Sequence, residues 1–320
     1  MFPSFDTSRL KLLPLAEREH DLDLSVILKL EPRPITHESL TKVAERIVRA
    51  KKQNAAVVLM MGGHVLRSGV QHYLIDLMEH GYISCLAMNG ACAIHDFEFA
   101  MIGQTTESVA KYIRDGRFGL WQETGQINTI VRKAAQNGLG LGEAVGKAIA
   151  ESDFPHKNIS IFGAGYRLGI LLTVHAGIGY DIAHQHPACD GASWGATSYL
   201  DFLRFAKVIE SLEGGVVMNF GSAVMAPEVY LKALSMARNV AMQNNKNIHK
   251  FTTLVCDLLT LPEDFHQEAP PDNHRYYFRP WKTMLVRTVA DGGESYYVNS
   301  SHELSVPELW TAIQKVDQCN

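Results

Sequence analysis

The sequence has few cysteines, no long apolar run and no marked excess of charge of either sign. Its five cysteines are odd in number and show no C-x-x-C spacing, so we expect free thiols in a reducing compartment. No apolar run approaches the roughly 18 residues that a membrane-spanning helix needs. The 30 basic and 34 acidic residues are intermixed and give a formal net charge of -4, which argues against binding to nucleic acid or to a membrane surface.

The N-terminal stretch lacks the basic start and apolar core of a secretory signal. The hydrophobic share of 46% is ordinary for a globular protein, and it is ample for a core in a chain of 320 residues. We therefore expect a cytoplasmic protein of enzyme size.

Residues 56–98 predict a strand, a glycine turn, an amphipathic helix and a second strand with its own turn. A strand, a helix and a strand in this order form a right-handed parallel crossover, which places both turns at the carboxyl edge of one sheet. Open α/β sheets bind ligands at that edge. The two strands and their turns are residues 56–61 with Gly62-Gly63 and residues 83–88 with Asn89-Gly90.

The second turn is followed by an imidazole and two carboxylates. If a helix begins near Ala91, His95 and Glu98 are three residues apart and share a face, with Asp96 between them in the sequence. The structural alternative is a polar helix start whose acids favour the positive end of the helix dipole. We favour a functional role, because His, Asp and Glu are seldom placed beside a ligand-binding edge without use.

The chain divides into an N-terminal arm and helix, residues 1–50, and a single domain, residues 51–320. The arm is polar and contains several prolines, and Thr36 is placed to cap a helix whose apolar positions repeat every three or four residues. A helical insertion at about residues 105–157 interrupts the strand pattern of the domain.

The glycine-rich residues 158–175 allow two interpretations. A strand over residues 159–162 with a dinucleotide fingerprint after it requires G-x-G-x-x-G, but the spacing here is one residue too long. A helix over residues 160–168, capped by Gly169 and followed by a strand at residues 170–175, is favoured. The glycines then let the helix pack close to its neighbours.

Strand and helix patterns alternate through the rest of the chain. Residues 261–279 form an acidic, proline-containing irregular loop, the segment most prone to disorder. The alternation occurs five or six times in all, so the fold class is α/β with a doubly wound, mostly parallel sheet. The expected strands are residues 215–219, 251–258 and 283–289, and the expected helices are residues 201–212, 227–240 and 306 onward.

Polar side chains follow four of the strands. Four such turns at one edge predict a cleft in which glycine amides bind phosphates and acids bind ribose hydroxyls. The clusters are Gly63 with His64; Asn89 with His95, Asp96 and Glu98; His184 with His186 and Asp190; and Asn219 with Ser222.

A metal site is the alternative interpretation of these clusters. His184 and His186 are both able to ligate if their segment is extended, with a residue after the second turn completing the site, but nothing in the sequence specifies the remaining ligands. Lys282 is either a solvated or a reactive lysine. His302 either reaches the same sheet edge or caps the last helix.

The sequence resembles deoxyhypusine synthase, an NAD-dependent enzyme that transfers the butylamine part of spermidine to a lysine of a translation factor. The resemblance starts at about residue 56 and rests on VVLMMGGHVLRSGVQHYLIDLMEHGYISCLAMNGA, HPACDGASWG, GGVVMNFGSAV and NSSHELSVPELW. It implies a Rossmann-like NAD-binding fold in a homo-oligomer of two or four subunits. The implied cofactor-binding residues are Gly63, His64, Asn89, Gly90, Asp190, Gly191, Gly221, Ser222 and His302.

Departures from that family bear on the activity. Its triple glycine followed by Lys-His-His reads here as FGSAVMAPE, its second aspartate aligns near Ala196, and Lys282 matches its imine-forming lysine only loosely. A spermidine pocket needs carboxylates that pair with ammonium groups. We therefore expect a deoxyhypusine synthase-like protein that is not a deoxyhypusine synthase.

The segment NGACAIHDFE also resembles part of the ornithine cyclodeaminases of the LOR/SDH type. NAD and an amine substrate are common to both resemblances, so we expect an NAD-dependent transferase or lyase. It would oxidise an amine to an imine before transfer, cyclisation or deamination. The alternatives are a metal-dependent hydrolase or lyase and a non-catalytic nucleotide-binding protein. The catalytic candidates are His95, Asp96, His184, His186 and Lys282.

Overall fold

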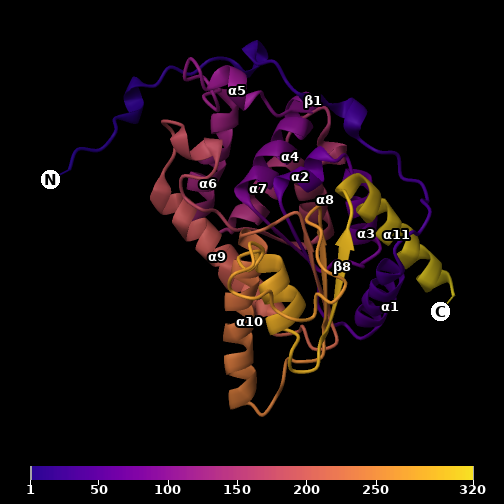
Figure 1. The fold of residues 1–320 in the computed structure, drawn as a ribbon. Coiled ribbons are helices and arrows are strands. Elements are labelled where there is room, and N and C mark those ends of the chain that lie inside the picture. The colour runs from indigo at the N-terminus through magenta and orange to yellow at the C-terminus, as the bar shows by residue number, and fades with distance from the viewer. Residues whose placement is uncertain (1, 320) are drawn as a thin grey trace.

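The computed structural model describes residues 2–319 and is built around one six-stranded parallel sheet (Figure 1). The strand order is β5-β3-β2-β6-β7-β8, and every neighbouring pair is parallel. The chain winds from β2 toward β5 on one side and from β6 toward β8 on the other, which is the Rossmann order and confirms the doubly wound α/β fold. The strands are β2 (Val57–Met61), β3 (Cys85–Met88), β5 (Leu171–Val174), β6 (Val216–Phe220), β7 (Thr252–Asp257) and β8 (Glu294–Asn299).

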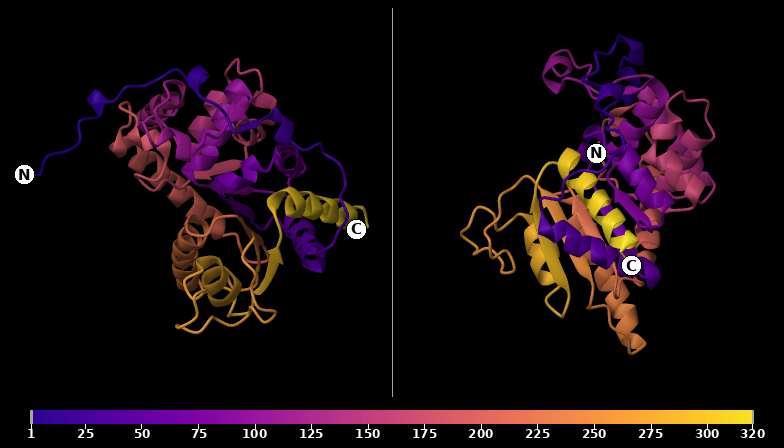
Figure 2. Two further views of the ribbon diagram at one scale, coloured as in Figure 1. Left: turned by 45° about the horizontal axis from the view of Figure 1, so that its top comes forward. Right: turned by 90° about the vertical axis from the view of Figure 1, so that its right-hand side faces the viewer.

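Helices cover both faces of the sheet, so β2, β3 and β6 are buried throughout and read as continuous apolar runs. Figure 2 shows α1 and α11 side by side over one face. That face carries α1 (Glu38–Lys52), α2 (Gly63–Arg67), α3 (Gln71–Glu79), α4 (Gly90–Ile102), α6 (Gln126–Gln136), α7 (Leu141–Ala150), α8 (Ile161–Leu168) and α11 (His302–Gln318). The other carries α9 (Gly191–Ile209), α10 (Met225–Gln243) and the π-helix η7 (Pro280–Arg287).

The N-terminal arm runs over the top of the molecule in Figure 1. Its strand β1 (Leu22–Asp23) pairs antiparallel with β4 (Gln104–Thr105), and the amide of Asp21 donates to the carbonyl of Thr106 at 3.0 Å. The side chain of Arg18 is buried against α4. The short helix α5 (Val109–Tyr112) lies next in the chain after this pairing. The arm is therefore attached to the domain by backbone pairing as well as by a buried cation.

The glycine-rich segment forms the helix α8, as the sequence predicts. The hydroxyl of Ser160 accepts a hydrogen bond from the amide of Gly163, and Gly169 ends the helix in the left-handed region with a φ of 68°. A Cβ built on Gly165 would lie 2.5 Å from the side chain of Leu172. The glycine thus lets α8 pack close to β5.

The prediction of a strand at residues 283–289 is wrong, because this segment belongs mostly to η7 and the sixth strand follows it. Every residue in 280–285 is buried, so the run has no periodicity that separates a buried helix from a strand. A proline at the first position favours a helix start. The true strand, β8, lies at the sheet edge, and only its Ser295 and Val298 are buried, so it lacks the expected apolar run.

Two helices begin four or more residues earlier than the sequence predicts. α9 begins at Gly191, because Asp190 caps it, and the small residues of its first turns hide it from hydrophobic periodicity. α11 begins at His302. The predicted cap of α1, Thr36, lies one residue too early, because the N-cap is His37, which makes no side-chain cap hydrogen bond. The carboxylate of Glu308 accepts hydrogen bonds from the amides of Thr36 and His37, just before the helix.

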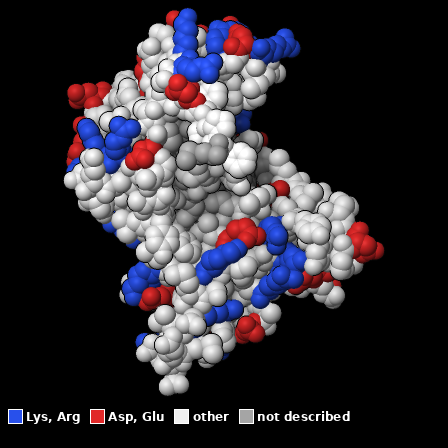
Figure 3. Space-filling view, turned by 90° about the vertical axis from the view of Figure 1, so that its left-hand side faces the viewer, with Lys and Arg blue, Asp and Glu red and all other residues white. Residues whose placement is uncertain are grey.

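Residues 261–279 contain no regular helix or strand in the described structure, as expected. The loop is nevertheless in contact with the domain, because Ala269 is buried and the indole of Trp281 donates to the carbonyl of Phe265 at 2.7 Å. Figure 3 shows acidic and basic side chains intermixed on one face of the molecule, in keeping with the small net charge.

Asp201 is a buried carboxyl in the middle of α9. Its Oδ2 accepts hydrogen bonds from the amides of Gly142 and Val174, both at 2.8 Å. Its Oδ1 is buried and has no hydrogen-bond partner within residues 2–319. Burial raises the pKa of this carboxyl to about 7, so the folded protein holds a proton there that the unfolded chain releases.

We expect the substitution Asp201→Asn to stabilise the protein increasingly as the pH rises from about 4 to about 7. Over this range the unfolded carboxyl loses its proton while the folded one keeps it, so the parent loses stability and the amide variant does not. One pKa unit corresponds to about 1.4 kcal/mol, which sets an upper limit of about 4 kcal/mol. Urea unfolding at several pH values measures it. The exposed Asp153→Asn is the control, and a pH-independent difference for Asp201→Asn would contradict the assignment.

Candidate active site

A cleft of about 800 Å³ opens at the carboxyl edge of the sheet. Its floor comes from the turns after β3, β5 and β6, and its walls come from α9 and the start of α10. The strand order reverses between β2 and β6, which is the position where open α/β sheets bind ligands. Residues that line the cleft include Asn89, Gly90, Ala91, His175, Asp181, Trp194, Gly195, Tyr199, Gly221 and Ser222.

The α9 wall of this cleft combines aromatic side chains with a bare backbone. Trp194 and Tyr199 line the cleft on either side of Gly195, where an added Cβ would meet no atom within 4 Å. Glycine inside a helix costs about 1 kcal/mol relative to alanine. A glycine that faces open space in a cleft wall leaves room for a ligand to approach the helix.

The turns after β2 and β6 are packed together beneath the cleft. A Cβ on Gly62 would lie 2.6 Å from the carbonyl oxygen of Gly221, and Gly221 itself has a φ of 63°. The amide of Ser222 donates to Asn219 Oδ1 at 3.2 Å, and the Ser222 hydroxyl accepts from the amide of Ala226 at 3.0 Å. Only residues without side chains allow this approach.

A smaller pocket of about 230 Å³ adjoins the cleft. The two share Ala91, Tyr180 and Asp181 in their linings. Polar and charged residues are frequent in the smaller lining, which includes Arg18, Arg67, His95, Glu98, Thr106 and Glu107. A ligand in the cleft and a smaller one in the pocket would therefore meet at the shared residues.

Glu98 carries a charge in this pocket that is balanced by a guanidinium and by two hydroxyl donors. Its carboxylate accepts two hydrogen bonds from the guanidinium of Arg18, at 2.9 and 2.7 Å, and one each from the hydroxyls of Thr105 and Thr124, at 2.7 and 3.1 Å. Both charged side chains are only 1% exposed. Burial raises the pKa of Glu98, but the Arg18 guanidinium and the hydroxyls outweigh it and leave the pKa lowered.

His95 lines the same pocket one turn before Glu98. Its Nδ1 lies 2.9 Å from the hydroxyl oxygen of Thr105. Burial is the largest cause that lowers the pKa of His95 to about 4, so the imidazole is neutral at neutral pH. A Cβ on Gly63 would lie 3.0 Å from the ring, so this glycine makes room for the histidine.

Two buried polar atoms of the pocket residues have no hydrogen-bond partner within residues 2–319. They are Nε of Arg67 and the hydroxyl oxygen of Thr106. Thr106 also has a φ of 66°, which is costly for a β-branched residue and is typical of functional sites. An unpaired guanidinium nitrogen and an unpaired hydroxyl suit a small anionic group such as a carboxylate.

Asp181 lies at the boundary between the two cavities. A Cβ on Gly90 would lie 2.1 Å from its Oδ2, so the carboxyl is packed against the first residue of α4. Burial raises the pKa of Asp181 to about 6. A cationic ligand group would therefore favour its ionised form.

The predicted convergence of several turns at one edge is visible in the structure. Asn89, Gly90, Gly221 and Ser222 line the cleft, and His95 lines the adjoining pocket. Gly63 lies behind His95, and His302 is buried beside Gly221, where a Cβ would come within 2.5 Å of its Nε2. His64 lies exposed on α2 beside them.

Other predicted residues have structural partners. Asp96 caps α8, because its carboxylate accepts from the Ser160 hydroxyl and from the amides of Ile161 and Phe162. Asp190 caps α9 by accepting from the amides of Ala192 and Ser193 and from the Ser193 hydroxyl, with Gly191 exposed next to it. Neither aspartate lines the cleft or the pocket.

The remaining candidates also lie outside both linings. His184 accepts through Nδ1 from the amides of Gly179 and Asp181, at 3.3 and 3.2 Å, which orders the loop. His186 accepts through Nδ1 from Ala188 N at 3.1 Å. Within residues 2–319, no group of three or more His, Cys, Asp or Glu is arranged to hold a metal ion.

Lys282 is buried on η7, where its Nζ lies 3.3 Å from the centre of the Tyr276 ring and 3.9 Å from Glu268 Oε2. The ammonium group therefore has two partners within the fold, an aromatic ring and a carboxylate, and these contacts favour a structural role for Lys282.

Sequence reasoning missed Arg18, Arg67, Thr106 and Asp181. Arg67 lies one turn after His64 on α2, and Asp181 follows the glycines after β5, so both had a positional signal. Arg18 and Thr106 had none, because the first lies in the arm and the second owes its role to an unusual backbone angle.

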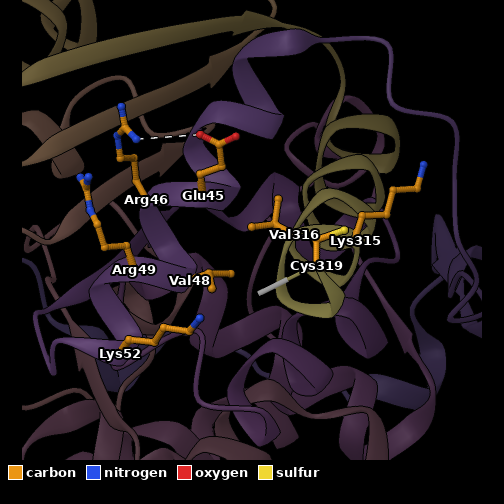
Figure 4. Close-up of a pocket in the computed structure, with 8 residues that line it drawn as sticks. All are labelled: Glu45, Arg46, Val48, Arg49, Lys52, Lys315, Val316 and Cys319. Atoms are coloured by element: carbon orange, nitrogen blue, oxygen red, sulfur yellow. Dashed lines mark ion pairs between the residues drawn. The ribbon is translucent and has the colours of Figure 1, made fainter.

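A third hollow, of about 550 Å³, lies between α1 and α11 (Figure 4). Its lining includes Arg46, Arg49, Lys52 and Lys315. The last turns of the two helices form it, at the opposite edge of the sheet from the cleft.

None of the helices in the described residues is long and apolar enough to cross a membrane.

Comparison with known proteins supports the fold. A family model described as the C-terminal, Rossmann-fold domain of arginine dihydrolase ArgZ-like proteins matches residues 41–153. No curated protein sequence matches the chain.

The solved structures that are similar to the chain include the following three. Cyanobacterial ArgZ, an arginine dihydrolase of the ornithine-ammonia cycle, is 17% identical with a TM-score of 0.50, over 86% of this chain and 32% of its own. AgrE in a ternary complex with ornithine and NAD+ is 17% identical with a TM-score of 0.50, over 90% and 35%. A protein described as LOR/SDH from Methanococcus maripaludis S2 is 14% identical with a TM-score of 0.51, over 91% and 74%.

The chain thus spans about a third of the length of ArgZ and AgrE. At these identities the likeness shows a related Rossmann-type fold and does not single out deoxyhypusine synthase.

We expect Gly62→Ala to lower the free energy of unfolding by about 1–3 kcal/mol, the usual cost of overpacking. The new methyl would lie 2.6 Å from a backbone carbonyl oxygen, so a turn must move rather than a flexible side chain. Urea unfolding measures the loss. Gly191→Ala, whose methyl meets no atom within 4 Å, is the matched control, and equal stability of the two variants would refute the close packing of the turns.

Proposed function

We propose that the chain is an NAD-dependent enzyme that oxidises the amine-bearing carbon of a small amino acid. The observation that carries this proposal is the junction of two cavities of different size at Ala91, Tyr180 and Asp181. The larger cavity has the position and size of a dinucleotide site. The smaller one offers unpaired groups for a carboxylate and a half-buried acid, Asp181, for an amine.

The cleft fits a dinucleotide in its shape and chemistry. Gly195 faces open space, and the aromatic side chains of Trp194 and Tyr199 lie beside it. The turn residues Gly90 and Gly221 have no side chains of their own, and the Asp181 carboxyl and the His302 ring pack against them. We assign the cofactor contacts to this cleft, with Asn89, Gly90, Gly221 and Ser222 among them.

The pocket would hold the substrate by its charges. Arg67 Nε and the Thr106 hydroxyl are unpaired and buried within residues 2–319, and they would bind the carboxylate. Asp181, at the junction, would pair with the amine, and the positive charge would draw its raised pKa down. These contacts orient the amine-bearing carbon toward the cleft.

His95 is the base in this proposal. Bound NAD would supply the hydride acceptor for a carbon that bears an amine. The amine nitrogen must then give up a proton as the C=N bond forms. A neutral imidazole whose pKa is lowered to about 4 is in its proton-accepting form over the whole neutral range.

The comparisons support the same choice. AgrE is described in complex with ornithine and NAD+, and another similar structure is described as LOR/SDH. NAD with an amine substrate is also what the sequence resemblances have in common. The fate of the imine, by transfer, cyclisation or deamination, is a prediction at the level of those resemblances, as are the cytoplasmic location and the homo-oligomeric state.

Titration calorimetry with NAD tests the cofactor. We expect Gly195→Ala to weaken binding roughly tenfold or more, about 1.4 kcal/mol, because the methyl fills space in the cleft wall. The same change should stabilise the free protein by about 0.5–1 kcal/mol, so weaker binding would not come from unfolding. Gly191→Ala, on the same helix but outside the cleft, is the control. Absence of NAD binding by the parent would refute the cofactor assignment.

The substrate class is tested by measuring how fast reduced nicotinamide forms. Amino acids are compared with the corresponding amines that lack a carboxylate. We expect the parent to prefer the amino acids and Arg67→Met to lose that preference, because the variant removes the cation that would pair with the carboxylate. Affinity for NAD should stay the same. Arg49→Met, in the basic hollow at the opposite edge, is the charge-matched control. An unchanged preference in Arg67→Met would exclude the carboxylate role of Arg67.

A further inference from the structure

The hydrogen bonds around Glu98 determine which nitrogen of His95 is free to accept a proton. Glu98 is paired with Arg18 and has a lowered pKa, so it is ionised and acts only as an acceptor. The hydroxyl of Thr105 lies 2.7 Å from Glu98 Oε2 and has a single hydrogen. That hydrogen is therefore donated to Glu98.

The contact between Thr105 and His95 must then run in the other direction. With its hydrogen given to Glu98, the Thr105 oxygen can only accept from Nδ1–H of His95, which lies 2.9 Å away. A neutral imidazole carries a hydrogen on only one of its two ring nitrogens. With that hydrogen on Nδ1, Nε2 is the nitrogen that carries the free lone pair.

We propose that Arg18 is a positioning residue that sets the tautomer of His95 through Glu98 and Thr105. The inference rests on the proposed function for the role of His95 as a base, but the tautomer itself does not. Arg18 keeps Glu98 ionised, Glu98 orients the Thr105 hydroxyl, and that hydroxyl holds the proton of His95 on Nδ1. Arg18 also lines the pocket, and the role assigned to it here runs through its two hydrogen bonds to Glu98.

Arg18 reaches this position because the N-terminal arm is held at several points. The amide of Leu15 donates to Glu123 Oε2 at 2.7 Å, and the amide of Glu19 donates to the hydroxyl of Tyr112 at 2.8 Å. The guanidinium Nε of Arg18 also donates to His20 Nδ1 at 3.2 Å. The position of the arm is thus coupled to the tautomer of His95. The two residues that make this connection, Arg18 and Glu98, are 80 positions apart in the sequence.

Removal of the positive charge reverses the chain of donors. In Arg18→Met the buried Glu98 would lose its ion pair and take up a proton. A protonated Glu98 donates to the Thr105 oxygen, whose hydroxyl then donates to His95 Nδ1. The imidazole proton moves to Nε2, and the free lone pair is lost from the pocket side.

Long-range hydrogen–nitrogen correlation spectra of the protein, with nitrogen-15 in its histidines and no ligand added, test this at pH 7.5. The His95→Gln variant identifies the His95 signals. We expect the Nδ1–H tautomer in the parent and the Nε2–H tautomer in Arg18→Met. Glu98→Gln, which keeps the shape but can donate to Thr105, should also give Nε2–H. Because it retains Arg18, this variant keeps the test decisive if Arg18→Met fails to fold.

Two further variants separate the hydroxyl relay from packing. Thr105→Ser keeps the hydroxyl and should keep Nδ1–H, whereas Thr105→Val keeps the shape without the hydroxyl and should lose the preference. The Nε2–H tautomer in the parent, or unchanged Nδ1–H in both Arg18→Met and Glu98→Gln, would overturn the proposal.

Turnover adds a second readout. We expect Glu98→Gln to lower kcat roughly 10²–10⁴-fold, the usual contribution of a general base, with little change in KM or in NAD affinity, and Thr105→Ser to retain most of kcat. If no amine is oxidised by the parent, the proposed function fails while the tautomer result still decides the role of Arg18. If kcat is unchanged in Glu98→Gln although the tautomer has inverted, Arg18 has no part in catalysis.

Discussion

Six parallel strands can be joined only by crossovers that return the chain to the same edge of the sheet, and the rest of this structure depends on that constraint. The crossovers from β2 run to one side and those from β6 to the other, so the turns after these strands face each other at the carboxyl edge. The close approach of Gly62 and Gly221 joins the turns below the cleft. The first turns of α9 and α4 both line this cleft.

The carboxyl groups enclosed in this structure have different partners and therefore different roles. On α4, Asp96 accepts from the amides at the start of α8 and serves packing, while Glu98 accepts from Arg18 and two hydroxyls beside the pocket. Asp201 is held by two amides, and burial raises its pKa to about 7. Asp181 differs from these in position, because it lies at the boundary of two cavities, where a ligand charge can complete its surroundings.

A shared fold does not determine a shared reaction, because Rossmann-type sheets carry many chemistries. The likeness to ArgZ, AgrE and a LOR/SDH protein therefore shows the fold alone. The chemistry has to be argued from the pocket. In this chain the pocket combines an imidazole on α4, a guanidinium on α2 and a second guanidinium from the arm. The arm, which looks peripheral in the sequence, supplies a buried charge to the site.

The sequence by itself determined the strands of the sheet interior, the crossovers and the edge at which the turns meet, because continuous apolar runs and helical spacing report burial directly. It also placed His95 and Glu98 on one face of α4 and indicated α8 through Gly169. Only the tertiary structure decided that Asp96 turns toward α8, that residues 280–287 form a helix, and that Arg18 meets Glu98. These outcomes depend on partners distant in the chain, and local periodicity contains no information about which distant donor will satisfy a buried acceptor.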